Sequence, residues 1–316
     1  MAEHLSERPA PALPTRADVE RARSTIGSRL LRTPLLSSRT LGAQLKCELF
    51  QRTGSFKARG ALNKLTSLTA EEKARGVIAI SAGNHAQAVA YAAAAEGSSA
   101  LVVMWQGASQ QKIDATRGYG AVVDLEATTP AEAFERLAVL EAETGRTLVH
   151  PFDDPIVIAG AGTVGLEIEE DAPDADVVIV AVGGGGLVSG LQTALGDRLR
   201  VVAVEPELSP ALHEALRNGR PTPVTPTSIA DGLNAPFAGA LPTEICRDIE
   251  RVLVAEEEIE HAFRVLYERT KLACEPAAAA AAAAWLSGKV IAERPVIVVS
   301  GGNVARQTAS AILARP

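Results

Sequence analysis

The chain has 316 residues, of which 47% are hydrophobic and 22% are charged, which predicts a folded globular protein with two domains or one domain carrying an insertion. The formal net charge of -7 and the lack of a Lys/Arg-rich stretch argue against nucleic acid as a main partner. No apolar run is long enough to span a membrane, and the polar, acidic first residues are unlike a signal peptide, so we expect a cytoplasmic protein without a membrane partner.

Residues 1–14 are rich in proline and polar side chains, and we expect them to form a mobile tail. After them, short apolar runs alternate with stretches of helical composition, which predicts an α/β fold with mostly parallel sheets. The apolar runs are continuous, as strands buried on both faces are. The expected strands are 77–81, 100–105, 121–124, 148–150, 177–182, 200–204, 252–254 and 296–300, and the expected helices are 84–96, 110–119, 130–144, 162–170, 187–195, 210–218, 256–271 and 276–287.

Lys57 lies among small residues and one aromatic in the segment 53–61, TGSFKARGA. A lysine in a desolvated pocket spends time as a free amine, which Schiff-base chemistry requires. Gly54 and Ser55 permit a close approach to a flat ring, and Phe56 can pack against its face. The alternative is a surface lysine at a helix start, with Thr53 or Ser55 as the N-cap.

A second segment, SAGNHAQ at 81–87, follows an expected strand and opens an expected helix. The free N–H groups and positive dipole end of a helix start suit a carboxylate. Asn84 can donate its amide to an anionic oxygen. The alternative is that Ser81 and Asn84 are ordinary caps and that His85 is a packed histidine, and for His85 alone we favour this alternative.

A third segment places Gly183, Gly184, Gly185 and Gly186 in a row before Leu187, between an expected strand and an expected helix. Four glycines leave the backbone bare, so several N–H groups can converge on one phosphate. A simple turn needs only one or two glycines.

The pattern GxGxxG also occurs, at 160–165, and it supports a competing class, an NAD-dependent oxidoreductase. That motif requires an acidic residue about 20 positions on, at the end of the next strand. The next expected strand ends in the glycines 183–186 instead. We therefore assign 160–165 to helix packing and keep the oxidoreductase as a distant alternative.

The segments resemble those of the serine/threonine dehydratase and serine racemase family, within the tryptophan synthase β-like group of pyridoxal phosphate enzymes. They occur in the family's order from about residue 33 to residue 303. The resemblance implies two open parallel-sheet domains: a large cofactor-binding domain of residues 15–75 and 152–316, and a small inserted domain of residues 76–151. It also implies a homodimer or a dimer of dimers.

The resemblance further implies roles for particular residues. Lys57 would hold pyridoxal phosphate as a Schiff base, Asn84 would contact the phenolic oxygen, and the glycines 183–186 with Leu187 would bind the phosphate. Ser300, in the segment SGGN, would hydrogen-bond the pyridine nitrogen without protonating it, which suits β-elimination better than transamination. The loop with Ser81, Ala82, Gly83, Asn84 and His85 would bind the substrate carboxylate.

Two weaker segments complete the resemblance. Gly232 would belong to a loop over the cofactor, and Glu275 would be an acid near the ring edge, with helix capping as its alternative. Glu205 corresponds to a ligand of the family's divalent cation, but the expected Asp partner falls near Ala211. We therefore predict no metal site, and Glu205 would then be a solvated strand end.

A departure at Ala82 favours one reaction within the family. Serine racemases carry a second Ser there, which serves the opposite face of the substrate carbon. The chain also stops soon after its last expected helix, so no allosteric domain is expected. The resulting hypothesis is a dehydratase that converts threonine, serine or another β-hydroxy amino acid to a 2-keto acid and ammonia, with Lys57 as the base. A racemase and a hydroxyaspartate ammonia-lyase remain alternatives.

Cys47, Cys246 and Cys274 form no CxxC pair and have no metal-ligand spacing. An odd, sparse count predicts free thiols in a reducing compartment. Each cysteine is expected to be a small buried apolar residue.

Overall fold

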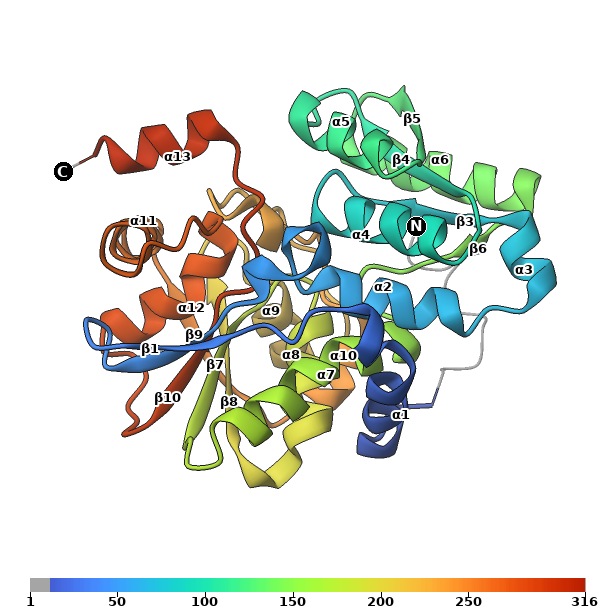
Figure 1. The fold of residues 1–316 in the computed structure, drawn as a ribbon. Helices are drawn as coiled ribbons and strands as arrows, with labels where there is room; N and C mark the ends of the chain where they lie inside the picture. The colour runs from blue at the N-terminus through green and yellow to red at the C-terminus, as the bar shows by residue number, and fades with distance from the viewer. Residues whose placement is uncertain (1–11, 316) are drawn as a thin grey trace.

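The computed structural model describes residues 12–315, so most of the expected tail lies outside the described residues. Two β-sheets, each with helices packed on it, organise this part of the chain (Figure 1). The expected α/β class with mostly parallel sheets is confirmed.

The larger sheet has six strands in the order β1-β2-β10-β7-β8-β9. Its strands are parallel except for the antiparallel hairpin of β1 and β2 at one edge. Strand β10 is the last strand in the described sequence, yet it lies inside the sheet, between β2 and β7. The bounds are β1 Leu35–Ser38, β2 Ala43–Lys46, β7 Val177–Ala181, β8 Arg200–Pro206, β9 Glu250–Val254 and β10 Pro295–Val298.

The smaller sheet has four parallel strands in the order β5-β4-β3-β6. All four are consecutive in the sequence, between the second and third strands of the larger sheet. The bounds are β3 Val77–Ile80, β4 Ala100–Trp105, β5 Val122–Ala127 and β6 Thr147–Leu148.

The helices are α1 Arg16–Ile26, α2 Lys57–Thr66, α3 Ala70–Arg75, α4 Asn84–Ala95, α5 Gln110–Gly118, α6 Pro130–Thr144, α7 Pro155–Asp171, α8 Gly186–Leu195, α9 Ala211–Asn218, α10 Ala240–Ile245, α11 Glu256–Val265, α12 Pro276–Leu286 and α13 Arg306–Leu313. Short 3₁₀ turns include η3 Glu48–Phe50, η4 Arg52–Gly54 and η6 Asp231–Leu233, and a π-helix, η7 Leu266–Thr270, extends α11.

Alternate side chains of the central strands enter two different cores. In β7, Val177 and Ile179 face the core that contains α11 and α12, while Val178 and Val180 face the core that contains α7 and α8. The strand is buried on both faces, which explains its continuous apolar run. Residues 276–284 of α12 are all buried, and their alanines let this helix lie close to the sheet.

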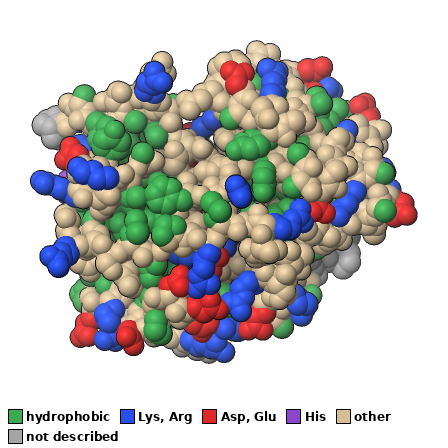
Figure 2. All heavy atoms as spheres, viewed as in Figure 1, with side chains coloured by type: hydrophobic (Ala, Val, Ile, Leu, Met, Phe, Trp, Pro, Cys, Tyr) green, Lys and Arg blue, Asp and Glu red, His purple; other side chains and the backbone are tan. Residues whose placement is uncertain are grey.

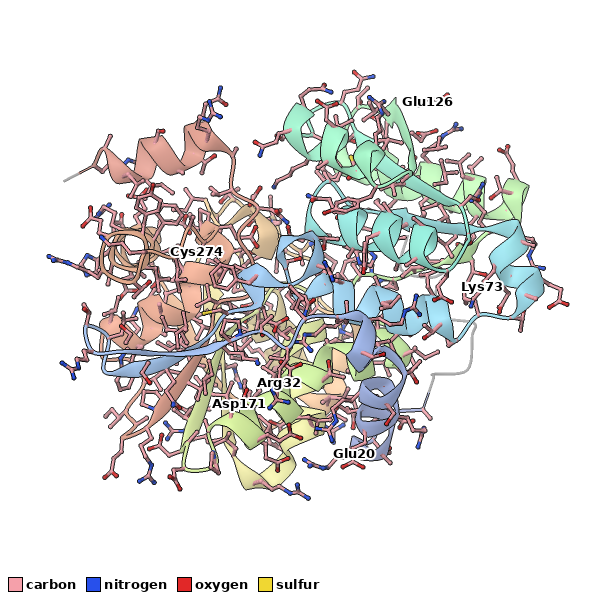
Figure 3. All side chains as sticks on the ribbon, in the orientation of Figure 1. Glu20, Arg32, Lys73, Glu126, Asp171 and Cys274 are labelled. Carbon is pink, nitrogen blue, oxygen red and sulfur yellow. The ribbon has the colours of Figure 1, made fainter. Side chains whose placement is uncertain are left out.

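Helix α2 joins the two sheets, because it packs on α4 of the smaller sheet and on α7 of the larger one (Figure 1). The approach to α7 depends on glycine: a Cβ on Gly60 would lie 2.7 Å from the Val157 carbonyl oxygen, and one on Gly160 would lie 2.6 Å from the Arg59 carbonyl oxygen. At the other end of α7, an ion pair of 2.6 Å between Arg32 and Asp171 ties the segment before β1 to the helix end (Figure 3).

All eight expected strands occur, but several elements differ from the expectations. Five helices are additional to the expected ones, namely α1, α2, α3, α10 and α13. The hairpin of β1 and β2 is additional, and the apolar pattern does not predict it because its strands are four residues long and β1 is not buried. Helix α7 begins at Pro155 and not at residue 162, because the Asp154 carboxylate accepts hydrogen bonds from the Ile156 and Val157 N–H groups at 2.8 and 3.2 Å. The expected helix 256–271 is helical to Thr270, but it changes from α-helix to π-helix after Val265.

The three cysteines are free and buried, as expected. Within residues 12–315, no helix combines the length and the apolar character needed to cross a membrane.

Candidate active site

The lysine segment docks on the segment that follows β10. Ser55 forms an antiparallel bridge with Gly301, and the Phe56 N–H donates to the Ser300 carbonyl oxygen at 3.1 Å. The Gly302 N–H donates to the Gly54 carbonyl oxygen at 2.9 Å. These bonds place Lys57 at the carboxyl ends of the parallel strands, where α/β proteins commonly bind ligands.

Lys57 is the first residue of α2, and its side chain is half-buried. Its Nζ donates to the Pro151 carbonyl oxygen at 2.7 Å and lies 5.1 Å from the centre of the Phe56 ring. Burial lowers the pKa of the Lys57 ammonium to about 8, and the nearby Glu275 carboxylate opposes this shift. The alternative of a solvated surface lysine is therefore wrong, although Lys57 does begin a helix.

Two hydroxyl groups beside Lys57 are buried without a partner. The Oγ1 of Thr53 and the Oγ of Ser55 have no hydrogen bond within the described part of the chain, although buried polar atoms are nearly always paired. Neither residue caps α2, so this alternative interpretation of Thr53 and Ser55 is also wrong. Thr53 has a backbone φ of +61°, which is unusual for a β-branched residue and frequent at functional sites.

Asn84 is linked to residues from two distant segments. Its Nδ2 donates to the Glu275 Oε1 at 2.7 Å, and its Oδ1 accepts a hydrogen bond from the Asn303 Nδ2 at 2.8 Å. Glu275 is 4% exposed, and burial together with repulsion from Asp231 raises the pKa of its carboxyl group to about 7, against the hydrogen bond from Asn84. Glu275 occupies the N-cap position of α12 but makes no side-chain cap hydrogen bond, so the capping alternative is wrong.

The other residues of the loop 81–85 make contacts within the smaller sheet's part of the chain or face open space. The Ser81 Oγ accepts from the Gly83 N–H at 3.1 Å, and a Cβ on Gly83 would meet no atom within 4 Å. Ala82 packs on the core of the smaller sheet. His85 is buried with its Nε2 2.8 Å from the Val149 carbonyl oxygen, and burial lowers the pKa of its ring to about 3. His85 is therefore a neutral, packed histidine near neutral pH.

The glycines 183–186 connect β7 to α8, and their backbone packs against other chain segments. A Cβ on Gly184 would overlap the Phe152 ring, and one on Gly183 would lie 3.1 Å from the Leu233 Cα. Gly185 has a φ of +100°, which favours glycine. The N–H groups of Gly183, Gly184 and Gly185 donate to no backbone acceptor among residues 12–315 and lie at a helix start, an arrangement suited to an anion.

The remaining predicted site residues are Ser300, Gly232, Leu187 and Phe56. Ser300 is buried and lies two residues after the end of β10. Gly232 lies in η6, where a Cβ would be 3.8 Å from the Glu275 Oε1. The Leu187 side chain belongs to the core of the larger sheet, so only its backbone can face a ligand, and the Phe56 ring packs partly on that core.

The GxGxxG segment lies inside α7, and its glycines face other helices instead of a ligand. A Cβ on Gly162 would lie 2.7 Å from the Gly190 carbonyl oxygen, and one on Gly165 would lie 2.9 Å from the Ala194 Cβ. The assignment to helix packing is confirmed, and the nucleotide-binding interpretation of this segment is wrong.

Glu205 is 1% exposed, so the expectation of a solvated strand end is wrong. Its carboxyl oxygens accept from the Leu212 and His213 N–H groups at 2.7 and 2.8 Å, at the start of α9. Burial raises the pKa of Glu205 to about 8. Within residues 12–315, no group of three or more His, Cys, Asp or Glu side chains is placed to hold a metal ion.

Several residues of the site carry too little signal for the sequence interpretation to find them. Pro151 and Phe152 connect Lys57 to the glycines, and Asn303 connects Thr53 to Asn84. Asn303 ends the segment SGGN, so its place in that motif is the available signal. Pro151 and Phe152 carry no such signal, because their role depends on a tertiary contact.

Comparisons with known proteins identify the family and several relatives. A family model described as a pyridoxal-phosphate dependent enzyme matches residues 27–302. An L-threonine ammonia-lyase of Geobacter sulfurreducens is 42% identical over 312 residues, covering 94% of this chain and 77% of the relative. One of Thermotoga maritima is 44% identical over 304 residues, covering 92% and 76%.

Solved structures are also similar. A threonine deaminase from T.th. superimposes with a TM-score of 0.87 at 40% identity, covering 92% of this chain and 99% of that protein. Serine racemase from Dictyostelium discoideum gives a TM-score of 0.86 at 36% identity, covering 93% and 100%.

Proposed function

The chain belongs to the pyridoxal-phosphate dependent enzyme family, and from that premise we propose that it is an L-threonine ammonia-lyase, forming 2-oxobutanoate and ammonia. The observation that carries the proposal is the buried amine of Lys57, whose pKa is lowered to about 8. Glu275, Asn84 and the glycine-rich start of α8 belong to the same region. A partly unprotonated amine in such a place is able to react with an aldehyde group.

The residues present fit pyridoxal phosphate. The N–H groups of Gly183, Gly184 and Gly185 suit a phosphate, and the unpartnered hydroxyls of Thr53 and Ser55 indicate that the site offers polar atoms to a ligand. We assign Lys57, Phe56, Asn84, Gly183–Leu187, Gly232, Glu275 and Ser300 to cofactor binding, and Ser81, Ala82, Gly83, Asn84 and His85 to substrate binding.

When bound, pyridoxal phosphate supplies an aldehyde that reacts with amines and a conjugated ring that withdraws electrons from the substrate α-carbon. Lys57 is the general base that removes the α-proton, because its amine is desolvated and partly unprotonated near neutral pH. The β-hydroxyl group leaves as water after taking up a proton. The released enamine hydrolyses to the 2-keto acid and ammonia.

Elimination is favoured over racemisation by the side chain at position 82. Ala82 has no ionisable group, so it cannot return a proton to the opposite face of the α-carbon. Racemisation would need a second acid or base on that face. A racemase therefore remains the weaker interpretation.

Phe152 follows Pro151, whose carbonyl oxygen Lys57 contacts, and it belongs to a cluster of aromatic rings that supports a substrate with an apolar β-substituent. The rings of Phe152 and Phe237 are 5.8 Å apart, and those of Phe237 and Phe134 are 6.3 Å apart, so three of the six phenylalanines gather here. His150 lies 4.8 Å from Phe152, and burial lowers the pKa of His150 to about 4, which leaves it neutral. An apolar group of rings at this place would suit the methyl group of threonine.

The test combines a variant with a substrate panel. Wild-type enzyme is expected to bind pyridoxal phosphate, absorb visible light and favour L-threonine over L-serine by about 10-fold or more in kcat/KM, the value of one buried methyl group. Lys57→Ala abolishes keto-acid formation, while Lys289→Ala, at an exposed lysine, does not. Turnover by Lys57→Ala, or D-amino acid formation faster than keto-acid formation, would refute the proposal.

Further proposals concern the organisation of the protein. The large domain comprises residues 15–75 and 152–316 and the small domain residues 76–151, in line with the separate sheets. The protein acts in the cytoplasm as a homodimer. Support for a dimer comes from exposed apolar side chains, among them Leu36, Phe50 and Tyr267, and from the hydrophobic cluster that Figure 2 shows on the face near α12.

A further inference from the structure

Asn303 lies between two segments of the site. Its Nδ2 donates to the Thr53 carbonyl oxygen at 2.7 Å and to the Asn84 Oδ1 at 2.8 Å. An amide nitrogen carries two hydrogen atoms, so both side-chain donors of Asn303 are engaged. Asn303 makes neither bond to its own segment, and it therefore connects the lysine segment to the start of α4.

The Thr53 carbonyl oxygen fixes which end of the Asn303 amide donates. The Thr53 carbonyl oxygen can only accept, so the nitrogen of Asn303, and not its oxygen, must face it. The same nitrogen faces Asn84, which must then present its oxygen to Asn303. The Nδ2 of Asn84 is thereby turned toward Glu275, to which it donates one hydrogen at 2.7 Å. Its second hydrogen remains available.

Asn303 has little freedom to turn over. A Cβ on Gly54 would lie 2.7 Å from the Asn303 Oδ1, so the side chain packs closely on the Gly54 backbone. The Gly302 N–H holds the Gly54 carbonyl oxygen at 2.9 Å, which fixes the two segments against each other. A reversed Asn303 amide would set its oxygen against the Thr53 carbonyl oxygen, and two acceptors repel.

We propose that Asn303 is a positioning residue that locks the amide of Asn84 with its nitrogen toward the cofactor ring. The proposal rests on the proposed function, because Asn84 is assigned there to the cofactor. A donor in this position stabilises the anionic form of a ring oxygen, whereas the amide oxygen would repel it. Both hydrogen atoms of the Asn303 amide nitrogen are bonded to Thr53 and Asn84. Asn303 therefore acts on the cofactor only through Asn84.

The test is the substitution Asn303→Asp, which keeps the shape but replaces the donor with an acceptor. The apoenzyme is titrated with pyridoxal phosphate, and the visible spectrum of the holoenzyme is recorded against pH. We expect the dissociation constant to rise about 10-fold or more and the spectral transition of the ring to move to higher pH. Asn303→Ala, which removes the amide without adding an acceptor, is expected to show the same changes to a smaller degree.

Two controls separate this role from a structural one. Asn218→Asp adds a charge at an exposed asparagine of α9 and should leave the affinity and the spectrum unchanged. In the Asn84→Ala background, Asn303→Ala should have little further effect on either readout, because its target is gone.

The outcomes are distinct. If wild-type protein fails to bind pyridoxal phosphate, the proposed function is wrong and the inference falls with it. If wild-type protein binds it while Asn303→Asp and Asn303→Ala retain wild-type affinity and spectrum, the inference alone is wrong. Equal effects of Asn303→Ala with and without Asn84 would also overturn it, since they would show a route that bypasses Asn84. Should Asn303→Asp not fold, the comparison of Asn303→Ala with the double variant decides between these outcomes.

Discussion

The reactivity of Lys57 depends on the state of one proton. Only the unprotonated amine attacks an aldehyde, and burial shifts the pKa of Lys57 from well above the neutral range down to about 8. The Glu275 carboxylate favours the ammonium form and so limits this shift. Lys57 and Glu275 therefore set together how much free amine exists near neutral pH.

We predict that covalent attachment of pyridoxal phosphate to the apoenzyme accelerates with rising pH, with a midpoint near 8. Glu275→Gln should move this midpoint to lower pH, because it removes the negative charge that stabilises the ammonium form. The rate of change in visible absorbance after mixing, followed across the neutral and alkaline range in steps of about half a pH unit, gives both midpoints. A midpoint near the ordinary lysine pKa, or a shift to higher pH in Glu275→Gln, would contradict this account.

Substitution of Gly184 tests the proposal that the glycine backbone binds the phosphate. Gly184→Ala would push a methyl group into the Phe152 ring and displace either the glycine backbone or the ring. We expect the affinity for pyridoxal phosphate to fall at least about 10-fold, measured by equilibrium titration of the apoenzyme. Gly118→Ala is the matched control: a Cβ there meets no atom within 4 Å, so affinity should be unchanged and stability should rise by about 0.5–1 kcal/mol.

At the scale of elements, α2 is anchored by a buried ionic network around Arg59. The guanidinium group donates to the Glu48 Oε2 at 2.8 Å and to the Glu167 Oε1 at 2.7 Å, and Lys46 pairs with Glu167 at 2.6 Å. The network joins α2 to the segment after β2 and to α7. Because Lys57 begins α2, the position of its amine depends on these buried charges.

Removing Arg59 leaves two buried carboxylates without their main partner. We expect Arg59→Met to lower the free energy of unfolding by about 3–5 kcal/mol, measured by urea denaturation of the apoenzyme. Arg52→Met, at an exposed arginine five residues before Lys57, should change it by less than about 0.5 kcal/mol. Equal effects of the two substitutions would show that the network does not stabilise α2.

Helices and strands with strong local signals could be predicted from the sequence, as the eight apolar strands and the proline-initiated α12 show. Elements that depend on distant partners could not. The β1–β2 hairpin joins the larger sheet because β2 pairs with β10. The first turns of α7, residues 155–161, contain a glycine that is explained only by close packing against α2. Likewise, the lysine segment was predictable from its composition, whereas the burial of Glu275 and the bridge through Asn303 exist only in the folded chain.

For the whole molecule, a surface ion pair connects the two sheets beside the site. Lys112 on α5 pairs with Asp231 in η6, next to Gly232. The Asp231 side chain is 59% exposed, so the pair contributes little to stability, about 0–1 kcal/mol. The pair nevertheless joins α5 to η6 beside Gly232, which we propose for cofactor binding, so we infer that it helps to position the smaller sheet there.

We predict that Lys112→Met raises the KM for L-threonine several-fold with little change in melting temperature. The KM of the wild-type enzyme should also rise with ionic strength, because salt screens exposed charges, and the variant should lose this dependence. Lys73→Met is the control, since Lys73 on α3 (Figure 3) pairs with Glu96 at the end of α4 and not with a residue of the larger sheet. A KM that responds to salt equally in all three proteins would rule out this role.

The interior position of β10 also constrains how the chain can be made. During synthesis the ribosome releases the four strands of the smaller sheet consecutively, and they can pair as soon as residue 148 has emerged. The larger sheet has to wait: β2 and β7 have no common neighbour until β10, residues 295–298, is released. Ser300 and Asn303 follow directly behind it. A nascent chain thus completes its main sheet only when the residues that we propose for cofactor binding after β10 are also released, and we expect a polypeptide that still lacks β10 not to capture the cofactor.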